Sequence, residues 1–199
     1  VTVAELHHWI TAVAVNRGPP TANNYHSAAS GVFQWAIDAG LIDENPMRSV
    51  RRRSTAGRQR DIYLSAKQVG HLLAACPDDL RPLVEVAVHT GMRLGELLSM
   101  QTEDVDLERA TLRVTAARSK SRMPRFVPLT PRAFEIMSRL IPAKGPVFGL
   151  TIGQFRTRWG RARRAAHGLP ADLRFHDLRH TAASLMVNAG VDLYVIGQV

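Results

Sequence analysis

Apolar side chains recur at helical spacing through the first fifty residues of the chain. Thr2 and Glu5 form a capping-box pattern ahead of the first apolar positions, which predicts a helix at the very start. Pro19-Pro20 is expected to break that helix, and Thr21 is expected to cap a second one. We therefore expect a small helical unit over residues 1–50.

A run of basic residues separates this unit from the rest of the chain. The stretch 51–60, RRRSTAGRQR, carries five arginines and no hydrophobic side chain larger than alanine. Such a composition is typical of an exposed segment, so we interpret residues 51–61 as an interdomain linker. Ser65 and Gln68 then form another capping box, and a second unit is expected over residues 62–199.

The second unit is predicted to be mainly α-helical with a small antiparallel β-sheet. Apolar and polar side chains alternate over residues 111–115 and 125–128, on either side of a basic turn, which is typical of a hairpin. Capping signals such as Thr130-Pro131 and the pair Thr151 and Gln154 predict helices around it. The helical stretches lie near residues 69–76, 80–89, 134–141, 155–166 and 176–189.

The charge of the chain narrows the possible partners. Its 199 residues carry a formal net charge of +9, and the pI is about 10.9. Such a field attracts polyanions, and a DNA backbone is the usual partner, although an RNA-binding or ribosomal role fits the charge equally well. Only three of the 26 basic residues are lysines, namely Lys67, Lys120 and Lys144. In so arginine-rich a chain, the position of each lysine is informative.

Other features indicate a reducing compartment. The single cysteine, Cys76, excludes an intramolecular disulfide, and no clustered Cys/His spacing indicates a zinc site. No apolar run approaches the roughly 20 residues that cross a bilayer, and the first residues lack a signal-peptide pattern. We expect a cytoplasmic protein.

Three local patterns contain residues suited to phosphate chemistry. In TGMRLGELLSM, Arg93 and Glu96 stand one helical turn apart, although this spacing is also common in weak surface ion pairs. In SKSRMPRFVPL, Lys120 lies in the basic turn between the predicted strands. Such turns are often basic because they are solvated, but a lysine, unlike an arginine, can lose a proton. In LRFHDLRHT, His176 and Arg179 begin a helix, where an anion is favoured.

Together these patterns resemble those of tyrosine recombinases, the family of phage integrases and Xer-type enzymes. TGMRLGEL, the hairpin lysine eight residues before the proline of VPL, and HDLRHT occur in the order and at the separations of that family. The segment ANNYHSAASGVFQWAIDAGLIDENP is similar to the second half of the family's core-binding domain, a SAM-like helical fold. Residues 62–199 are similar to most of its catalytic domain, the fold of DNA breaking-rejoining enzymes.

The resemblance implies a role for each of these residues. Arg93 and Arg179 would hold the non-bridging oxygens of the scissile phosphate and stabilise the charge that develops on them. Lys120 would donate a proton to the leaving 5′ oxygen, and His176 would assist phosphate binding and proton movement. Glu96 would orient Arg93 or His176. In the family a tyrosine forms a 3′-phosphotyrosyl link to DNA, with no metal and no nucleotide cofactor.

The nucleophilic tyrosine is missing from the expected place. The family pattern continues after HDLRHT with a Leu-Gly-His-like segment and then the tyrosine, whereas this sequence ends at VDLYVIGQV. Tyr194 lies only fifteen residues after Arg179 and is interpreted as a packing residue, while Tyr25 and Tyr63 match no part of the motif. Truncation, loss of the remainder, or a nucleophile from a partner subunit would each explain this. We expect residues 1–199 to bind DNA without cleaving it.

The expected partner is double-stranded DNA, bound by a homo-oligomer that would be a tetramer in the complete enzyme, with no membrane involved. Most contacts should go to phosphates, from arginines of the linker and of the helix near residues 155–166. The candidates are Arg51, Arg52, Arg53, Arg156, Arg158 and Arg161. Two alternatives stay open. One is a non-catalytic DNA-binding module or regulator derived from an integrase, and the other is a type IB topoisomerase, which acts on any duplex.

Overall fold

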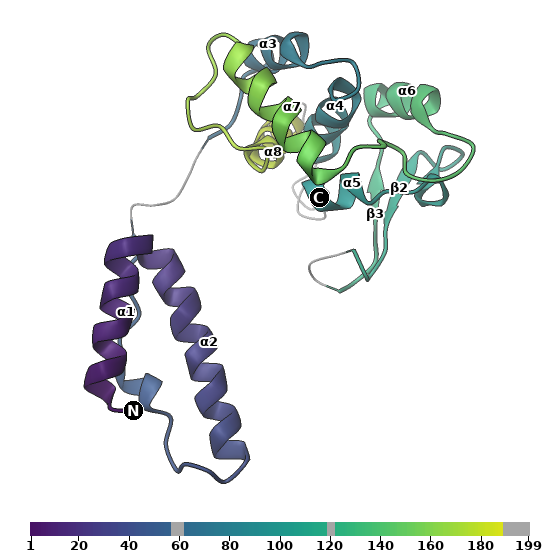
Figure 1. The fold of residues 1–199 in the computed structure, drawn as a ribbon. Helices are drawn as coiled ribbons and strands as arrows, with labels where there is room; N and C mark the ends of the chain where they lie inside the picture. Colours follow the sequence, from purple (N-terminus) through teal and green to yellow (C-terminus); the bar gives the residue numbers. More distant parts are fainter. Residues whose placement is uncertain (57–61, 119–121, 189–199) are drawn as a thin grey trace. The chain divides into compact units, whose positions relative to one another are not determined.

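The computed structural model describes residues 1–56, 62–118 and 122–188, and the chain divides into two compact units, Val1–Arg60 and Asp61–Val199 (Figure 1). The described parts are mainly helical, with one small antiparallel sheet, which confirms the predicted fold class. The end of the basic stretch, Lys120 and Tyr194 lie outside the described residues.

The first unit is a helical hairpin followed by one short turn of helix. Its elements are α1 (Val3–Arg17), α2 (Pro19–Asp38) and the 3-10 helix η1 (Pro46–Ser49). Thr2 and Glu5 form the predicted capping box of α1. The apolar side chains that fill the small core come from all three elements and the residue after them: Leu6, Ile10, Ala22, Met47 and Val50.

The prediction that Thr21 caps the second helix is wrong. α2 begins at Pro19, so Pro19 and Pro20 occupy its first turn, and the preceding cap is Gly18 with a φ of +86°. Proline has no N–H to leave unsatisfied at a helix start, and its fixed φ suits the first turn. The two prolines that were expected only to end one helix therefore also begin the next.

Part of the basic stretch is attached to the helical unit. The Asn23 side chain donates to the Arg53 carbonyl oxygen and accepts the Arg53 backbone N–H, each at 2.8 Å. Arg53 Nη2 donates to Thr11 Oγ1 at 2.6 Å, and Arg52 Nη2 donates to Ser27 Oγ at 2.9 Å. Residues 52 and 53, which the sequence places in the linker, are therefore bound to the helical unit.

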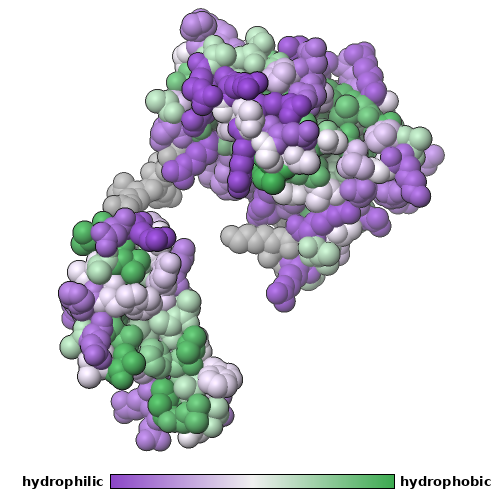
Figure 2. Space-filling view, viewed as in Figure 1, coloured by the Kyte–Doolittle hydropathy of each residue, from purple (hydrophilic) through white to green (hydrophobic). Residues whose placement is uncertain are grey.

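Hydrophobic side chains gather on the surface of the helical unit (Figure 2). On α2, Tyr25, Val32 and Trp35 recur at helical spacing, and Trp35 is 63% exposed. Tyr25 meets Trp9 of α1 edge to face, with ring centroids 5.8 Å apart. Helices normally bury such a stripe against a neighbour, so this face of α2 departs from the usual pattern.

The second unit is built around the buried helix α4. Its helices are α3 (Ala66–Ala75), α4 (Arg81–Thr90), α5 (Leu94–Leu98), η2 (Thr102–Asp104), α6 (Pro131–Leu140), α7 (Ile152–Ala165) and α8 (Asp177–Asn188). α4 contacts α3, α5, α6 and α8, which explains why most of its side chains are buried (Figure 1). The cysteine at the end of α3, Cys76, is also buried in this core, and burial raises the pKa of its thiol to about 11.

A three-stranded antiparallel sheet lies beside these helices. Its strands, in the order β1-β2-β3, are β1 (Val105–Asp106), β2 (Thr111–Val114) and β3 (Arg125–Pro128). Leu112 pairs with Val127, and both are buried, as the predicted alternation requires. β1 is too short to show alternation in the sequence and was not predicted, and α5 was not predicted as a separate helix.

Candidate phosphate-binding site

Arg93 is positioned by a tight turn between α4 and α5. α4 ends at Thr90, and Gly91 adopts a left-handed conformation with a φ of +63°, while its N–H donates to the Ala87 carbonyl oxygen. Glycine takes a positive φ without the steric cost that a Cβ brings. The sequence Thr90-Gly91-Met92 therefore ends α4 abruptly and makes Arg93 the capping residue of α5.

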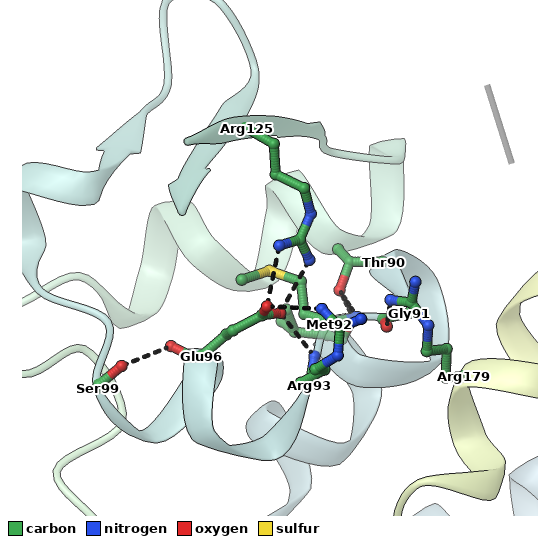
Figure 3. A network of polar contacts seen from close by, with 9 residues as sticks. Thr90, Gly91, Met92, Arg93, Glu96, Ser99, Arg125 and Arg179 are labelled. Atoms are coloured by element: carbon green, nitrogen blue, oxygen red, sulfur yellow. Dashed lines mark hydrogen bonds and ion pairs between the residues drawn. The ribbon is translucent and has the colours of Figure 1, made fainter. Parts of the chain in front are cut away.

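Glu96, the third residue of α5, joins Arg93 to strand β3 (Figure 3). Its side chain is only 2% exposed. The carboxylate accepts the Arg93 backbone N–H at 2.9 Å and Arg93 Nη1 at 3.1 Å. Arg125, the first residue of β3, donates Nη1 and Nη2 to the two carboxylate oxygens at 2.9 Å each. Two arginines from separate elements thus share one buried carboxylate.

The ionisation of Glu96 depends on these arginines. Burial alone would raise the pKa of Glu96, because a carboxylate loses its hydration in the protein interior. The hydrogen bonds from Arg125 and Arg93 outweigh this effect, so the pKa of Glu96 lies below its ordinary value. Glu96 is therefore an anion at neutral pH.

Arg179 reaches the same place from α8. Its Nη1 donates to the Gly91 carbonyl oxygen at 2.9 Å (Figure 3). Burial lowers the pKa of Arg179, and the charges of Arg93 and Arg125 lower it further, while Glu96 acts in the opposite direction. Three guanidinium groups against one carboxylate leave a net charge of +2 here. A group of cations in a partly buried place favours a bound anion.

His176 lies close enough to these arginines to interact with their charges. It directly precedes Asp177, the first residue of α8. Partial burial lowers the pKa of His176, and the charges of His180, Arg179 and Arg93 act in the same direction. The imidazole is therefore mostly neutral at pH 7, when one ring nitrogen donates and the other accepts a hydrogen bond.

The structure brings together four of the five site residues that the sequence analysis names: Arg93, Glu96, His176 and Arg179. Of the two partners considered for Glu96, it is Arg93 that hydrogen-bonds to it. Lys120 lies outside the described residues. His180 lies beside His176, with ring centroids 6.0 Å apart.

Arg125 is the site residue that sequence reasoning missed, although a signal for it exists. Side chains of a strand alternate between its two faces, so Arg125 shares a face with the buried Val127. A charged residue in a core-facing register needs a partner, because arginine is almost never buried unpaired. That register predicts a buried acid in contact with Arg125, but it does not say which one.

A second buried carboxylate holds the base of the β2–β3 hairpin. Asp104, in η2, is 3% exposed and forms an ion pair with Arg118, which follows β2. Arg113 Nη2 lies 3.6 Å from the same carboxylate, and the Gln101 backbone N–H donates to it at 2.9 Å. Arg118, which follows β2, and Arg125, which begins β3, are therefore each held by a buried carboxylate.

The six arginines expected to bind DNA differ in whether their guanidinium groups already contact other residues of the protein. Polar and charged residues cover much of the visible face of the larger unit (Figure 2). On α7, Arg158 Nε lies 2.6 Å from Asp79 Oδ2. Arg52 and Arg53 contact residues of the helical unit. The remaining three are exposed and have no ion pair within the described part of the chain: Arg51, Arg156 and Arg161.

Among the described residues, no three His, Cys, Asp or Glu side chains gather in a way that could hold a metal ion. In the same part of the chain, no helix combines the length and the apolar character needed to cross a bilayer.

Comparison with known proteins identifies the family. Residues 63–199 match the family model described as the phage integrase family. The chain is 30% identical over 221 residues to a putative prophage phiRv2 integrase of Mycobacterium tuberculosis, covering 97% of this chain and 58% of that protein. It is 25% identical over 187 residues to a tyrosine recombinase of Thermosipho africanus, covering 88% of this chain and 65% of that protein. The chain thus spans about 58 to 65% of the length of these relatives.

Solved structures show the same fold. A lambda integrase dimer bound to a COC′ core site superposes with a TM-score of 0.78 at 24% identity, covering all of this chain and 78% of that one. The Tn1549 transposon integrase in complex with circular intermediate DNA superposes with a TM-score of 0.75 at 17% identity, covering 99% of this chain and 77% of that one. The chain belongs to the phage integrase family of tyrosine recombinases, as the three sequence patterns predict.

Proposed function

We propose that the protein is a site-specific DNA recombinase of the integrase type, which cuts and rejoins DNA through a 3′-phosphotyrosyl intermediate. Family membership supports DNA recombination as the class of reaction. The observation that carries the proposal is the convergence of Arg93, Arg179 and His176 around one cationic position, although they come from the start of α5 and the start of α8.

In the proposed reaction, Arg93 and Arg179 hold the non-bridging oxygens of the scissile phosphate through guanidinium N–H groups. The tyrosine hydroxyl gives its proton to the free ring nitrogen of the neutral His176 imidazole, and its oxygen forms a bond to phosphorus while the bond to the 5′ oxygen breaks. The arginines stabilise the charge on the non-bridging oxygens. The leaving 5′ oxygen takes a proton from Lys120. His176, neutral at pH 7, donates a hydrogen bond to the phosphate. These steps require no metal and no cofactor.

The two units would divide the work of holding DNA. We assign the unit Val1–Arg60 to clamping the duplex, as part of a core-binding domain, and the unit Asp61–Val199 to the catalytic domain. A related lambda integrase has been solved as a tetramer bound to a Holliday junction, with a TM-score of 0.77 to this chain. This likeness supports a homotetramer on double-stranded DNA as the working form of the complete protein.

Covalent adduct formation tests the proposed function. The substrate is a duplex that the protein selects from a random-sequence library. It carries a nick, so that the short cleaved end diffuses away and rejoining is prevented. The full-length protein should stay covalently bound to the 3′ end of this duplex, which a denaturing gel detects. Residues 1–199 alone are expected to bind this duplex without an adduct, because Tyr25 and Tyr63 match no part of the family's tyrosine motif and Tyr194 is interpreted as a packing residue. An adduct with this fragment would contradict that expectation. If the full-length protein binds but forms no adduct, a non-catalytic DNA-binding module is the better description.

DNA affinity should fall steeply with salt, because the proposed contacts are mainly to phosphates. The logarithm of the binding constant falls with the logarithm of salt concentration by about 0.9 for each neutralised phosphate. Replacing the exposed Arg156 and Arg161 by alanine should therefore reduce the slope by about 0.9 each. Arg158→Ala is the matched control on the same helix and should change the slope less, because Arg158 already pairs with Asp79. Fluorescence anisotropy at several salt concentrations measures this, and an unchanged slope in the double variant would exclude α7 from the DNA interface.

A further inference from the structure

We propose that Arg125 is a positioning residue, which occupies the Glu96 carboxylate and thereby keeps the guanidinium of Arg93 available for the scissile phosphate. The inference rests on the proposed function, because it gives Arg93 its role. It concerns the same site but adds a residue to which neither the family patterns nor the proposed reaction assigns a task. Four hydrogen bonds and the exposure of three side chains carry it.

Glu96 uses its whole capacity to accept hydrogen bonds. An ionised carboxylate offers about four lone-pair positions. One oxygen of Glu96 accepts Arg93 Nη1 at 3.1 Å and Arg125 Nη1 at 2.9 Å. The other accepts the Arg93 backbone N–H at 2.9 Å and Arg125 Nη2 at 2.9 Å. The carboxylate is therefore filled, and half of its capacity is taken by Arg125.

Most donors of the Arg93 guanidinium have no side-chain partner among the described residues. A guanidinium carries five N–H donors in a rigid plane, and two of them can face both oxygens of one anion. Within the described residues, Arg93 commits only its Nη1 to a side-chain partner. The Arg93 side chain is 36% exposed, whereas the Arg125 side chain is 18% exposed and Glu96 is 2% exposed. Arg125 is thus the more buried partner of the carboxylate, and Arg93, the more exposed partner, keeps donors free for another anion.

Loss of Arg125 would leave Arg93 as the remaining arginine partner of Glu96. A buried carboxylate is costly unless it is paired, so Glu96 would recruit the nearest remaining donors. Arg93 is already bound to it, and a rotation of the guanidinium would turn this single contact into the preferred bidentate pair. That rotation would direct the fork of Arg93 at Glu96 and away from a phosphate. Arg125 therefore acts on the reaction through Arg93, without touching the substrate.

The test uses Arg125→Met in the full-length protein, with cleavage measured on two forms of the selected duplex. One has an ordinary scissile phosphate, and the other has a methylphosphonate, in which a neutral methyl group replaces a charged non-bridging oxygen. Because the neutral linkage needs less stabilisation by a guanidinium, Arg93→Ala should lose much less activity on methylphosphonate than on phosphate. Arg125→Met should behave in the same way. Its cleavage rate should fall by about 10- to 100-fold on phosphate and by about 3-fold or less on methylphosphonate.

Companion variants keep the test decisive if Arg125→Met folds poorly. Arg125→Lys retains the charge but cannot form the bidentate pair, so it should show a smaller loss with the same preference for methylphosphonate. Adding Glu96→Gln to Arg125→Met removes the competing carboxylate charge and should restore part of the activity on phosphate. Arg132→Met is the matched control, because Arg132 forms a similar double ion pair with Glu85 and Glu135. Arg132→Met should leave the cleavage rates on phosphate and on methylphosphonate unchanged.

The outcomes separate the inference from the proposed function. The inference would be overturned if Arg125→Met and Arg125→Lys lost equal cleavage activity on both substrates while Arg93→Ala lost less activity on methylphosphonate than on phosphate. That result would mean that Arg125 only supports the fold. If Arg93→Ala cleaves ordinary phosphate at the wild-type rate, or shows no relative gain on methylphosphonate, the proposed role of Arg93 is wrong and the inference is lost with it.

Discussion

Arg93→Lys in the full-length protein should slow covalent-adduct formation by at least about 100-fold, because the loss of one preorganised donor to a developing anion costs about this much. Lysine keeps the charge, but it carries a single ammonium group in place of a planar fork. It cannot hold Glu96 with one nitrogen and present a further pair of donors to a phosphate, which the proposed role of Arg93 requires. The measurement is the rate of adduct formation on the nicked duplex under single-turnover conditions.

DNA binding provides the contrast for this prediction. Equilibrium affinity of the Arg93→Lys protein should change by less than about 3-fold, since the sequence-independent part of binding depends on charge. Arg161→Lys, an exposed and conservative substitution on α7, should leave both adduct formation and affinity near wild type. A parallel fall in both quantities for Arg93→Lys would indicate that this residue contributes only to binding, as in a non-catalytic module.

Glu96→Ala should be the most destabilising single change in the site. It removes the partner of Arg125, whose side chain is 18% exposed and whose Nε is buried without a hydrogen-bond partner in the described part of the chain. Breaking one half of a buried ion pair costs about 3–5 kcal/mol, because a buried charge is left uncompensated. Urea unfolding followed by circular dichroism measures the free energy of unfolding. Glu135→Ala is the control, since its arginine partners are exposed, and its unfolding midpoint should stay at the wild-type value.

The same carboxylate predicts a pH dependence of stability. Because the folded-state pKa of Glu96 is below its ordinary value, the unfolded chain binds a proton more readily than the folded one. The stabilisation is therefore complete above the ordinary pKa of about 4.5 and is lost as the pH falls through the lower, folded-state value. Glu96→Gln should lose less stability than wild type when the pH is lowered from about 5 to about 3. Equal losses would show that Glu96 does not contribute to acid sensitivity.

The sequence predicts the elements whose signals are local. The capping boxes at Thr2, Ser65 and Thr151 lie where expected, because a cap involves residues only three positions apart. The two alternating strands pair in the expected antiparallel sense for a similar reason, since their pattern fixes which side chains face the core. The start of α2 was misjudged because a proline both ends a helix and suits the first turn of the next.

The site was predictable only in part, because its contacts join distant segments. Arg93 and Glu96 are three residues apart and could be paired from the sequence alone. The partners Arg125 and Glu96 are 29 residues apart, and Arg179 and Gly91 are 88 apart, so nothing in the local pattern links them. The family resemblance indicated that Arg93 and Arg179 meet at one phosphate. It did not indicate that a third arginine, Arg125, shares the Glu96 carboxylate with Arg93.

The burial of Cys76 also makes the protein convenient for site-directed labelling. A thiol with a pKa of about 11 is almost entirely protonated at neutral pH, and a 3% exposed residue is hard for a maleimide to reach. A cysteine introduced at an exposed position would therefore react almost alone, with the native thiol left in place. Met123, 67% exposed beside strand β3, is such a position. A fluorophore there would report directly on the surroundings of the hairpin when DNA is added.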